Sequence, residues 1–364
     1  MHSSQVFIRY LFLAALCLFL AACRIEINSP IGGSVKTVSD RYSCDENNRC
    51  TIDVVDTLFT EDFYAKPFSG YEFAGWKQQY RGFCGGYGGN CSLSTVGFDG
   101  WEVLTSVLDS DEVFYLTPRF QPTEETCGNL ESNFGINPSA PDSPSLESTI
   151  TLDILTKDDP TSLVSVEYRG RGVRSMYNRE TNTTTNENAR LFEAIFESGK
   201  TIELQVNPDF SQRIALEFAG SYAESLGRIP DFLIQAVDVI LIQPGDGGLA
   251  AIPGNILIHT QSAEEIFAPL GYIEEAILHE ATHSLMNNVY DADPDWLMAQ
   301  QLDMSFISGY AADFPTTEDH AESMMAYLTV RLWQERVDPE VYQQIVDSIP
   351  NRILFYDCLL PSIN

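Results

Sequence analysis

Two histidines and a glutamate stand at a spacing that suits metal-assisted hydrolysis. The chain reads His279-Glu280-Ala281-Thr282-His283, an H-E-x-x-H pattern. Residues i and i+4 of an α-helix lie on one face about one turn apart, so both imidazoles can bind one ion. Glu280 lies beside them and can take a proton from a water that the ion activates. The pattern predicts one catalytic Zn²⁺ bound by His279 and His283, with Glu280 as general base.

A catalytic zinc also needs a third protein ligand. Downstream stands Glu318-Asp319-His320-Ala321-Glu322. If this stretch is helical, Glu318 and Glu322 share a face, so the spacing alone does not decide which of them binds the ion. Asp319 and His320 also carry metal-binding atoms and stay open as alternatives.

The two motifs together, H-E-x-x-H and a downstream E-x-x-A-E, resemble those of lethal-factor-like gluzincins, zinc metallopeptidases with a zincin fold. The resemblance covers about residues 271–332. It implies that Glu318 binds zinc and that Glu322 orients a ligand histidine. That family places a tyrosine seven residues before the ligand glutamate. Here Tyr310 precedes Glu318 by eight, and the resemblance implies that it stabilises the transition state.

The surrounding sequence indicates the elements that must position these residues. The apolar residues Ile273, Ala276, Ile277 and Leu285 make the motif helix amphipathic, which predicts that one side is buried. Residues 255–260 read as a strand, and we expect this strand to be the sheet edge that holds an extended substrate. Other strands are expected at residues 151–156, 163–170, 201–206 and 237–243, and helices at 188–198, 210–226, 232–236 and over most of the chain from residue 273.

The first part of the chain has a different pattern. Residues 36–120 hold short alternating runs broken by glycine-rich turns, which predicts a small β domain. Its stretches GYEFAGW, CGGYGGNC and EVFYLTPRF resemble the divergent internalin-type B-repeat of bacterial surface proteins. Residues 121–148 are rich in Pro, Ser, Glu and Asn, which predicts a linker. The fold class expected is therefore α+β, with a β domain before a zincin-like metallopeptidase domain at residues 149–364.

The N-terminus is typical of an export signal. Residues 1–22 carry one arginine and then an apolar run shorter than the ~20 residues that span a bilayer. The segment Leu20-Ala21-Ala22-Cys23 resembles the bacterial lipobox. The resemblance implies a lipoprotein that is anchored to a membrane through acylated Cys23, with residues 23–35 as a tether. Such a protein would be exported, to the outer membrane, and would be periplasmic or surface-exposed.

Six further cysteines follow the lipobox in the chain. In an oxidising compartment an even number of cysteines predicts disulfides. Cys44 is close in sequence to Cys50, and Cys84 to Cys91, which leaves Cys127 and Cys358. The other connectivities stay open at this point.

Charge narrows the function classes. The formal net charge is −31, from 52 acidic and 21 basic residues, so a phosphate backbone would be repelled and nucleic acid is not an expected partner. We expect a lipid-anchored zinc metalloendopeptidase that hydrolyses protein or peptide substrates. The alternative is a surface adhesion or interaction lipoprotein whose zincin domain is a non-catalytic scaffold. Glu280 favours the enzyme, because a scaffold needs no general base. No pattern indicates an oligomeric state.

Overall fold

The computed structural model describes residues 23–144, 146–286 and 292–360. It is a mixed α+β structure, which confirms the expected class. The described residues form two compact units. One comprises residues 23–29, 34–66 and 75–118, and the other comprises 30–33, 67–74 and the chain from residue 119 on. The expected signal segment, residues 1–22, lies outside the described residues.

The first unit is built from two small sheets, with strand orders β4-β1-β8 and β3-β2-β5-β7. Its elements are β1 (Cys23–Ser29), β2 (Gly33–Thr37), β3 (Ser43–Cys44), β4 (Asn48–Val54), β5 (Thr60–Pro67), β7 (Cys91–Ser94), α1 (Glu102–Leu108) and β8 (Val113–Leu116). Strand β1 is antiparallel to β4 and parallel to β8. The tether expected at residues 23–35 is therefore wrong, because alternate residues such as Ile25 and Ile27 are buried against neighbouring strands.

The second unit contains a six-stranded mixed sheet in the order β10-β11-β12-β13-β15-β14. Its strands are β10 (Leu163–Asn178), β11 (Thr183–Phe196), β12 (Thr201–Val206), β13 (Val239–Gln243), β14 (Leu249–Ile252) and β15 (Asn255–His259). Strands β12, β13 and β15 are parallel, and the other neighbours are antiparallel. Alternate residues, among them Leu204, Ile240 and Ile258, are buried in the main core on one face.

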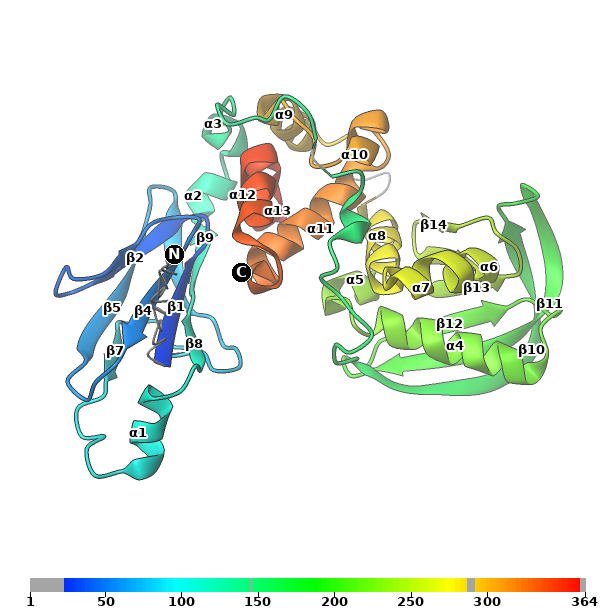
Figure 1. Ribbon diagram of the computed structural model, residues 1–364. Helices are drawn as coiled ribbons and strands as arrows, with labels where there is room; N and C mark the ends of the chain where they lie inside the picture. Colours follow the sequence, from blue (N-terminus) through cyan, green and yellow to red (C-terminus); the bar gives the residue numbers. More distant parts are fainter. Residues whose placement is uncertain (1–22, 145, 287–291, 361–364) are drawn as a thin grey trace, which may run out of the picture. The chain divides into compact units, whose positions relative to one another are not determined.

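The two longest strands form a hairpin that bends. Strand β10 has 16 residues and β11 has 14, and their pairing shifts register between Tyr168 and Gly170, as at a β-bulge, which bends a strand. Beyond this point Met176 packs with Leu241 and Leu257, which alternate with the core-facing residues of their strands. The end of the hairpin therefore curls over the sheet face opposite the main core (Figure 1).

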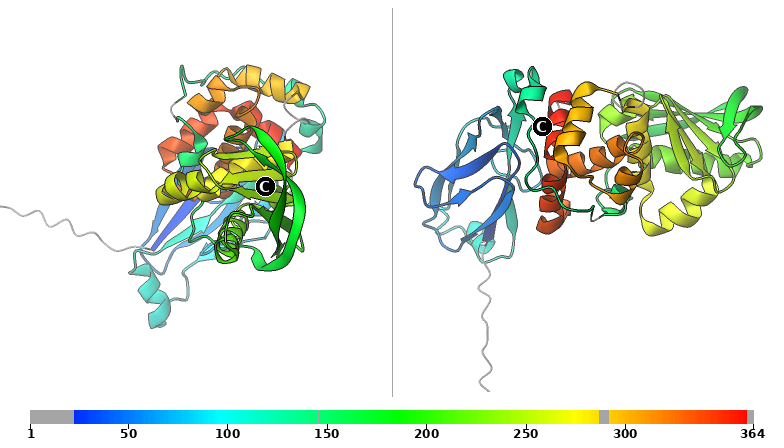
Figure 2. Two further views of the ribbon diagram at one scale, coloured as in Figure 1. Left: turned by 90° about the vertical axis from the view of Figure 1, so that its right-hand side faces the viewer. Right: turned by 90° about the horizontal axis from the view of Figure 1, so that it is seen from above.

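Helices cover the face of the sheet that is buried in the main core, and further helices continue away from the sheet. The first are α4 (Gln212–Leu226), α5 (Asp231–Gln235), α6 (Thr260–Ser262), a π-helical turn Ala263–Phe267, α7 (Ala268–Leu270) and α8 (Ile273–Met286). Next come α9 (Pro294–Asp303), α10 (Gly309–Asp313), α11 (Asp319–Leu332), the 3₁₀ turn Gln334–Arg336, α12 (Pro339–Ser348) and α13 (Pro350–Leu359). Helices α11, α12 and α13 lie on the side of α8 away from the sheet (Figures 1 and 2).

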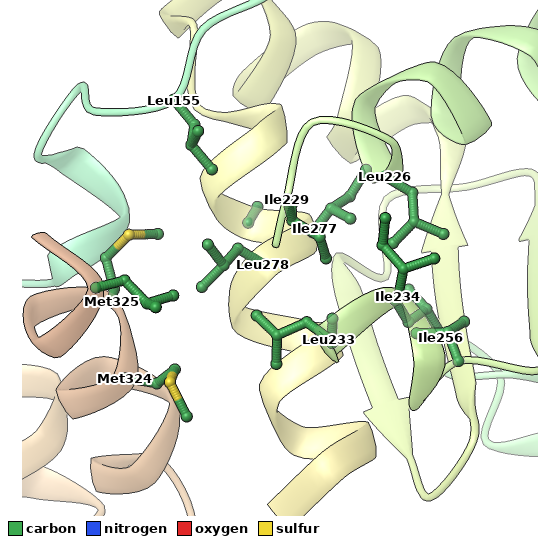
Figure 3. Packing of buried hydrophobic residues seen from close by; sticks show 14 of the residues in the cluster. Leu155, Leu226, Ile229, Leu233, Ile234, Ile256, Ile277, Leu278, Met324 and Met325 are labelled. Carbon is green, nitrogen blue, oxygen red and sulfur yellow. The ribbon is translucent and has the colours of Figure 1, made fainter. Parts of the chain in front are cut away.

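Helix α8 is the central element of this unit. Figure 3 shows Ile277 on the side of Leu226 and Ile229, and Leu278 turned toward Met325 of α11. All of these side chains belong to one buried cluster that joins sheet and helices. Because α8 is packed on two sides, its backbone is a rigid support for any side chain that it presents.

Several expected elements differ from the structure. The helix expected at residues 188–198 is wrong, because this segment is part of β11 and pairs with β10 and β12. The strand expected at 151–156 is also wrong. This segment begins at the last residue of a 3₁₀ turn, Thr149–Thr151, and has no strand partner among the described residues. The backbone N–H of Ile154 donates to Glu275 of α8 at 2.5 Å instead. The linker expected at 121–148 instead contains the end of β9 (Pro118–Pro122), α2 (Glu124–Cys127) and α3 (Leu130–Asn133). Strand β9 pairs with β6 (Tyr71–Trp76).

The described residues contain three disulfides: Cys44–Cys50, Cys84–Cys91 and Cys127–Cys358. The first two are the pairs that proximity in the sequence suggested, and the third joins the two cysteines that those pairs leave over. Disulfides are typical of proteins in an oxidising environment. The last one joins α2 to α13 within the second unit. Among the described residues no helix combines the length and the apolar composition that crossing a membrane requires.

Candidate metal centre

Helix α8 carries the H-E-x-x-H residues and is held at its start by buried acids. Glu274 pairs with Arg228 at 3.1 Å, and both groups are nearly inaccessible to solvent. Glu275 accepts backbone N–H groups from Ile154 and Leu155. Acidic groups in the first turn also suit the positive end of the helix dipole. The helix therefore has a fixed position when it presents His279 and His283 one turn further on.

The first turn of α11 supplies the other side of the site. Glu318 is the N-cap residue of this helix. Next to it, Asp319 pairs with Arg352 of α13 at 2.5 Å, and Arg352 also pairs with Asp303 of α9 at 2.8 Å. All three of these charged side chains are buried. A buried and fully paired ion network of this kind fixes the start of α11, and with it Glu318.

Three ligand atoms converge between the two helices. Glu318 Oε2 lies 3.2 Å from His279 Nε2 and 3.1 Å from His283 Nε2, and the two Nε2 atoms are 3.2 Å apart. Ligand atoms that share a tetrahedral ion at about 2.0–2.1 Å stand roughly 3.3 Å from one another. The donors are also of the types that bind transition metals. This group, His279, His283 and Glu318, can hold a metal ion.

The charges of the cluster favour a cation. Burial opposes a charge on His279, but the carboxylates of Glu318 and Glu322 outweigh it and raise the His279 pKa to about 10. Burial likewise disfavours ionised Glu318, yet the two histidines hold its pKa well below the usual range. A site that retains a proton so strongly provides the electrostatic environment that a metal ion needs.

Glu322 lies behind His279 rather than among the converging atoms. Its Oε1 accepts a hydrogen bond from Ser148 Oγ at 2.7 Å, and its Oε2 accepts one from the backbone N–H of Thr149 at 2.6 Å. His279 Nδ1 is 3.4 Å from Oε1, although this contact lacks the geometry of a good hydrogen bond. A carboxylate held so close to Nδ1 favours the tautomer that leaves Nε2 free to bind an ion.

A cleft of about 430 Å³ opens above the converging atoms. Glu280 and Tyr310 both line it. Burial raises the Glu280 pKa above its usual value although His279 and His283 oppose the shift. Burial and the charges of Glu318 and Glu280 raise the Tyr310 pKa to about 12, so its hydroxyl keeps its proton and can donate a hydrogen bond. The cleft thus combines a base with a neutral hydrogen-bond donor.

The remaining candidates lie elsewhere. His320 is buried and stacks on Trp296, with ring centroids 3.5 Å apart, and its Nδ1 lies 3.3 Å from the Tyr356 hydroxyl. Asp319 is engaged by Arg352. Neither residue belongs to the converging group. Cys23 is buried in β1 of the first unit.

The structure also adds residues that the sequence reasoning missed. Arg179, in the turn between β10 and β11, lines the cleft. The edge strand beside the cleft is β14, with Ala250 and Ala251 as lining residues, whereas the expected edge strand, β15, lies between β13 and β14. The residues before β14 read as a loop because of their glycines. No local pattern connects Arg179 with a motif a hundred residues further along the chain.

Comparisons with protein-family models, with curated proteins and with solved structures returned no match for this chain.

Proposed function

We propose that this chain is a zinc metallopeptidase of gluzincin type that cleaves protein or peptide substrates. The observation that carries the proposal is the convergence of three ligand atoms, one from Glu318 and two from the H-E-x-x-H histidines, at 3.1–3.2 Å. The accompanying Glu280 lines the adjoining cleft. Two imidazoles and one carboxylate, with a cleft beside them, form the donor set of a catalytic rather than a structural zinc site.

The chain's own residues have distinct roles in this proposal. When bound, zinc would lower the pKa of a water and polarise the scissile carbonyl. Glu280 accepts the proton of the attacking water and later delivers it to the leaving amine, tasks that suit a carboxylate whose pKa is raised. Tyr310 donates its hydroxyl proton in a hydrogen bond to the developing oxyanion. Glu322 keeps His279 in the correct tautomer.

Strand β14 supplies a place for the substrate backbone. Among the described residues its only sheet neighbour is β15, and Ala250 and Ala251 line the cleft. An extended peptide can add to such an edge through main-chain hydrogen bonds. The small side chains of these alanines leave room for it.

Metal analysis and peptide hydrolysis by matched variants test the proposal. The wild-type chain should bind about one zinc and cleave a mixed peptide library. Glu280→Gln should keep the metal and lose at least about 100-fold in hydrolysis, because a general base contributes roughly 10²–10⁴-fold. Glu217→Gln is the matched control, since Glu217 is exposed on α4 and Arg213 is its one ion-pair partner among the described residues.

The outcomes separate the proposal from its rival. A chain that binds no zinc when it is supplied with the metal would contradict the proposal. A chain that binds zinc but cleaves no peptide would favour the alternative, an adhesion or interaction protein with a metal-stabilised scaffold.

We also propose that Cys23 is the lipid attachment site of an exported bacterial lipoprotein. The lipobox-like residues before it support this, as do the disulfides. Cys23 lines a cavity of about 370 Å³ together with apolar residues such as Ile25, Phe59 and Phe114. Mass spectrometry of the membrane fraction tests it. An unmodified Cys23 in the mature protein would contradict the proposal.

A further inference from the structure

The turn of the long hairpin is attached to the far side of its own sheet. Strand β10 is at one edge of the strand order and β14 is at the other. Nevertheless Arg179, just after β10, donates from its backbone N–H to His259 Nε2 at 3.3 Å, and from its guanidinium Nη1 to the carbonyl of Leu249 at 2.7 Å. Gln243 of β13 donates to the Tyr177 carbonyl at 3.1 Å. The turn is thus bonded to β13, β14 and β15.

His259 is fixed in the tautomer that this attachment requires. It is fully buried, and its Nδ1 lies 2.8 Å from the carbonyl oxygen of Pro244. A carbonyl can only accept and an amide N–H can only donate, so Nδ1 carries the proton and Nε2 is the acceptor for Arg179. Gly247 allows the loop to approach, because a Cβ there would stand 2.8 Å from the imidazole ring. The loop before β14, His259 and the Arg179 turn are therefore packed and hydrogen-bonded to one another.

This attachment brings a positive charge into an acidic cleft. Arg179 is the only lysine or arginine among the residues that line the two adjoining parts of the cleft. Glu280 and Glu318 also line this cleft, together with His279 and His283. Among the described residues no carboxylate forms an ion pair with Arg179, and the guanidinium donates one hydrogen bond, to the Leu249 carbonyl. A guanidinium has five N–H donors, so four remain for a ligand.

We propose that Arg179 is a specificity-determining residue that binds a carboxylate of the peptide substrate, close to the scissile bond. The inference rests on the proposed peptidase function. A planar guanidinium binds a carboxylate through two parallel hydrogen bonds. Its contact with the Leu249 carbonyl holds it at the start of β14, where a peptide would lie along Ala250 and Ala251. The carboxylate can belong to an aspartate or glutamate side chain or to the C-terminus of a short peptide.

The main test compares hydrolysis of blocked peptides that carry Glu, Gln or Lys at one position at a time. Wild-type protein should prefer Glu over Gln at one position near the cleavage site, by roughly 10- to 100-fold in kcat/KM. This is the fold-change that corresponds to the usual net contribution of a hydrogen bond to a charged group. Arg179→Gln should reduce the ratio to about one, because the Glu peptide loses its charged partner and the Gln peptide does not. Arg179→Lys should retain part of the preference, and Arg179→Glu should favour Lys.

Two further measurements identify the source of the carboxylate and the cause of any loss of hydrolysis. Neutral peptides with a free or an amidated C-terminus show whether the terminal carboxylate is the group bound. Arg171→Gln is the matched control, since Arg171 is an exposed arginine of the same hairpin outside the cleft. An equal loss on Glu and Gln peptides in Arg179→Gln would overturn the inference, because it would indicate a role in the chemistry or in folding.

Failure of the inference can be told apart from failure of the proposed function. Wild-type protein that cleaves Glu and Gln peptides equally well, with free and amidated ends, overturns the inference alone. If no peptide is cleaved, the proposed function fails. Binding of fluorescent Glu and Gln peptides to the full chain then tests Arg179, by the change in anisotropy. Equal binding of the two peptides by wild type and by Arg179→Gln would overturn the inference in that case.

Discussion

The floor and the rim of the cleft are built in different ways. The floor, made by His279, His283 and Glu318, has side chains at most 20% exposed. They come from α8 and the start of α11, which are held by buried ion pairs. The rim, made by Arg179 and Tyr310, is more exposed, with Tyr310 at 39%. The Arg179 turn is attached mainly by hydrogen bonds.

This difference separates two tasks. A metal site requires donor atoms fixed to within a few tenths of an ångström, so its support must be buried and densely packed. Groups that contact a substrate can change without loss of the core, because few buried contacts depend on them. Changes below the floor should therefore alter folding and metal binding together. Changes on the rim should alter rate and substrate preference alone.

The largest effect is expected below the floor, at Arg352. Arg352→Met leaves Asp303 and Asp319 as buried carboxylates without their partner, and removal of one member of a buried ion pair costs about 3–5 kcal/mol. Burial already raises the pKa of both acids, so they would take up protons as the pH falls. Urea unfolding should show the loss of stability, and the zinc content should fall with it.

The control is the exposed Arg213, whose side chain is 74% accessible and, in the described part of the chain, pairs with Glu217 alone. Arg213→Met should change stability by less than about 0.5 kcal/mol. A loss below about 1 kcal/mol in Arg352→Met would show that packing, rather than the ion network, holds the start of α11.

The second effect is expected on the rim. Tyr310→Phe keeps the ring against Phe314, whose centroid is 5.2 Å away, and removes only the hydroxyl. Removal of one oxyanion donor typically lowers kcat by about 10²–10³-fold. KM, zinc content and thermal stability should stay close to wild type. Tyr168→Phe, in β10 and outside the cleft, should have no effect on kcat. Unchanged kcat in Tyr310→Phe would leave this tyrosine a structural role.

The floor was the easier part to predict from the sequence. His279, Glu280 and His283 are four residues apart at most, so helix geometry alone brings them to one site. The structure then places Glu318 among the converging atoms and Glu322 behind His279, a distinction that i,i+4 spacing could not make. It depends on Ser148 and Thr149, which are more than 170 residues away in the sequence.

The rim was not predictable, for a physical reason. Arg179 reaches the cleft only because β10 and β11 form a long bent hairpin, and part of β11 had the composition of a helix. Residues 188–196 contain helix formers, among them Ala189, Leu191 and Ala194, beside the strand formers Phe192, Ile195 and Phe196. Their apolar positions fit either period. The segment is a strand because it pairs with β10 and β12, so tertiary contacts override its local preference. The His259 contact, 80 residues away, leaves no local signal.

The third effect concerns the start of α8 and depends on pH. Burial raises the Glu275 pKa to about 7 although the Ile154 and Leu155 amides lower it. The folded state therefore binds a proton more tightly than the unfolded state, and this group's stabilising contribution is present at low pH and lost as the pH rises toward 7. Between pH 5 and 8 the loss is about 2.5 kcal/mol. Glu275→Gln should remove that part of the pH dependence.

Stability measured by urea unfolding at pH 5, 6, 7 and 8 checks this prediction. The amide can still accept the N–H of Ile154, so the variant should match wild type near pH 5 and exceed it near pH 8. Glu340→Gln, at an exposed position of α12, should follow the wild-type curve at every pH. Parallel curves for wild type and Glu275→Gln would show that Glu275 stays ionised through this range.

The smallest effect is expected at the residue that joins floor and support, Glu322. In Glu322→Gln the amide oxygen can still accept the N–H of Thr149, and the amide N–H can donate to Ser148 Oγ, but the negative charge 3.4 Å from His279 Nδ1 is removed. Loss of such a supporting group typically weakens metal binding by about 10–100-fold. Competition with a zinc chelator should show this, with folding almost unchanged. Complete loss of zinc here, with retention in Glu318→Gln, would instead make Glu322 the third ligand and place the floor of the cleft one helical turn further along α11.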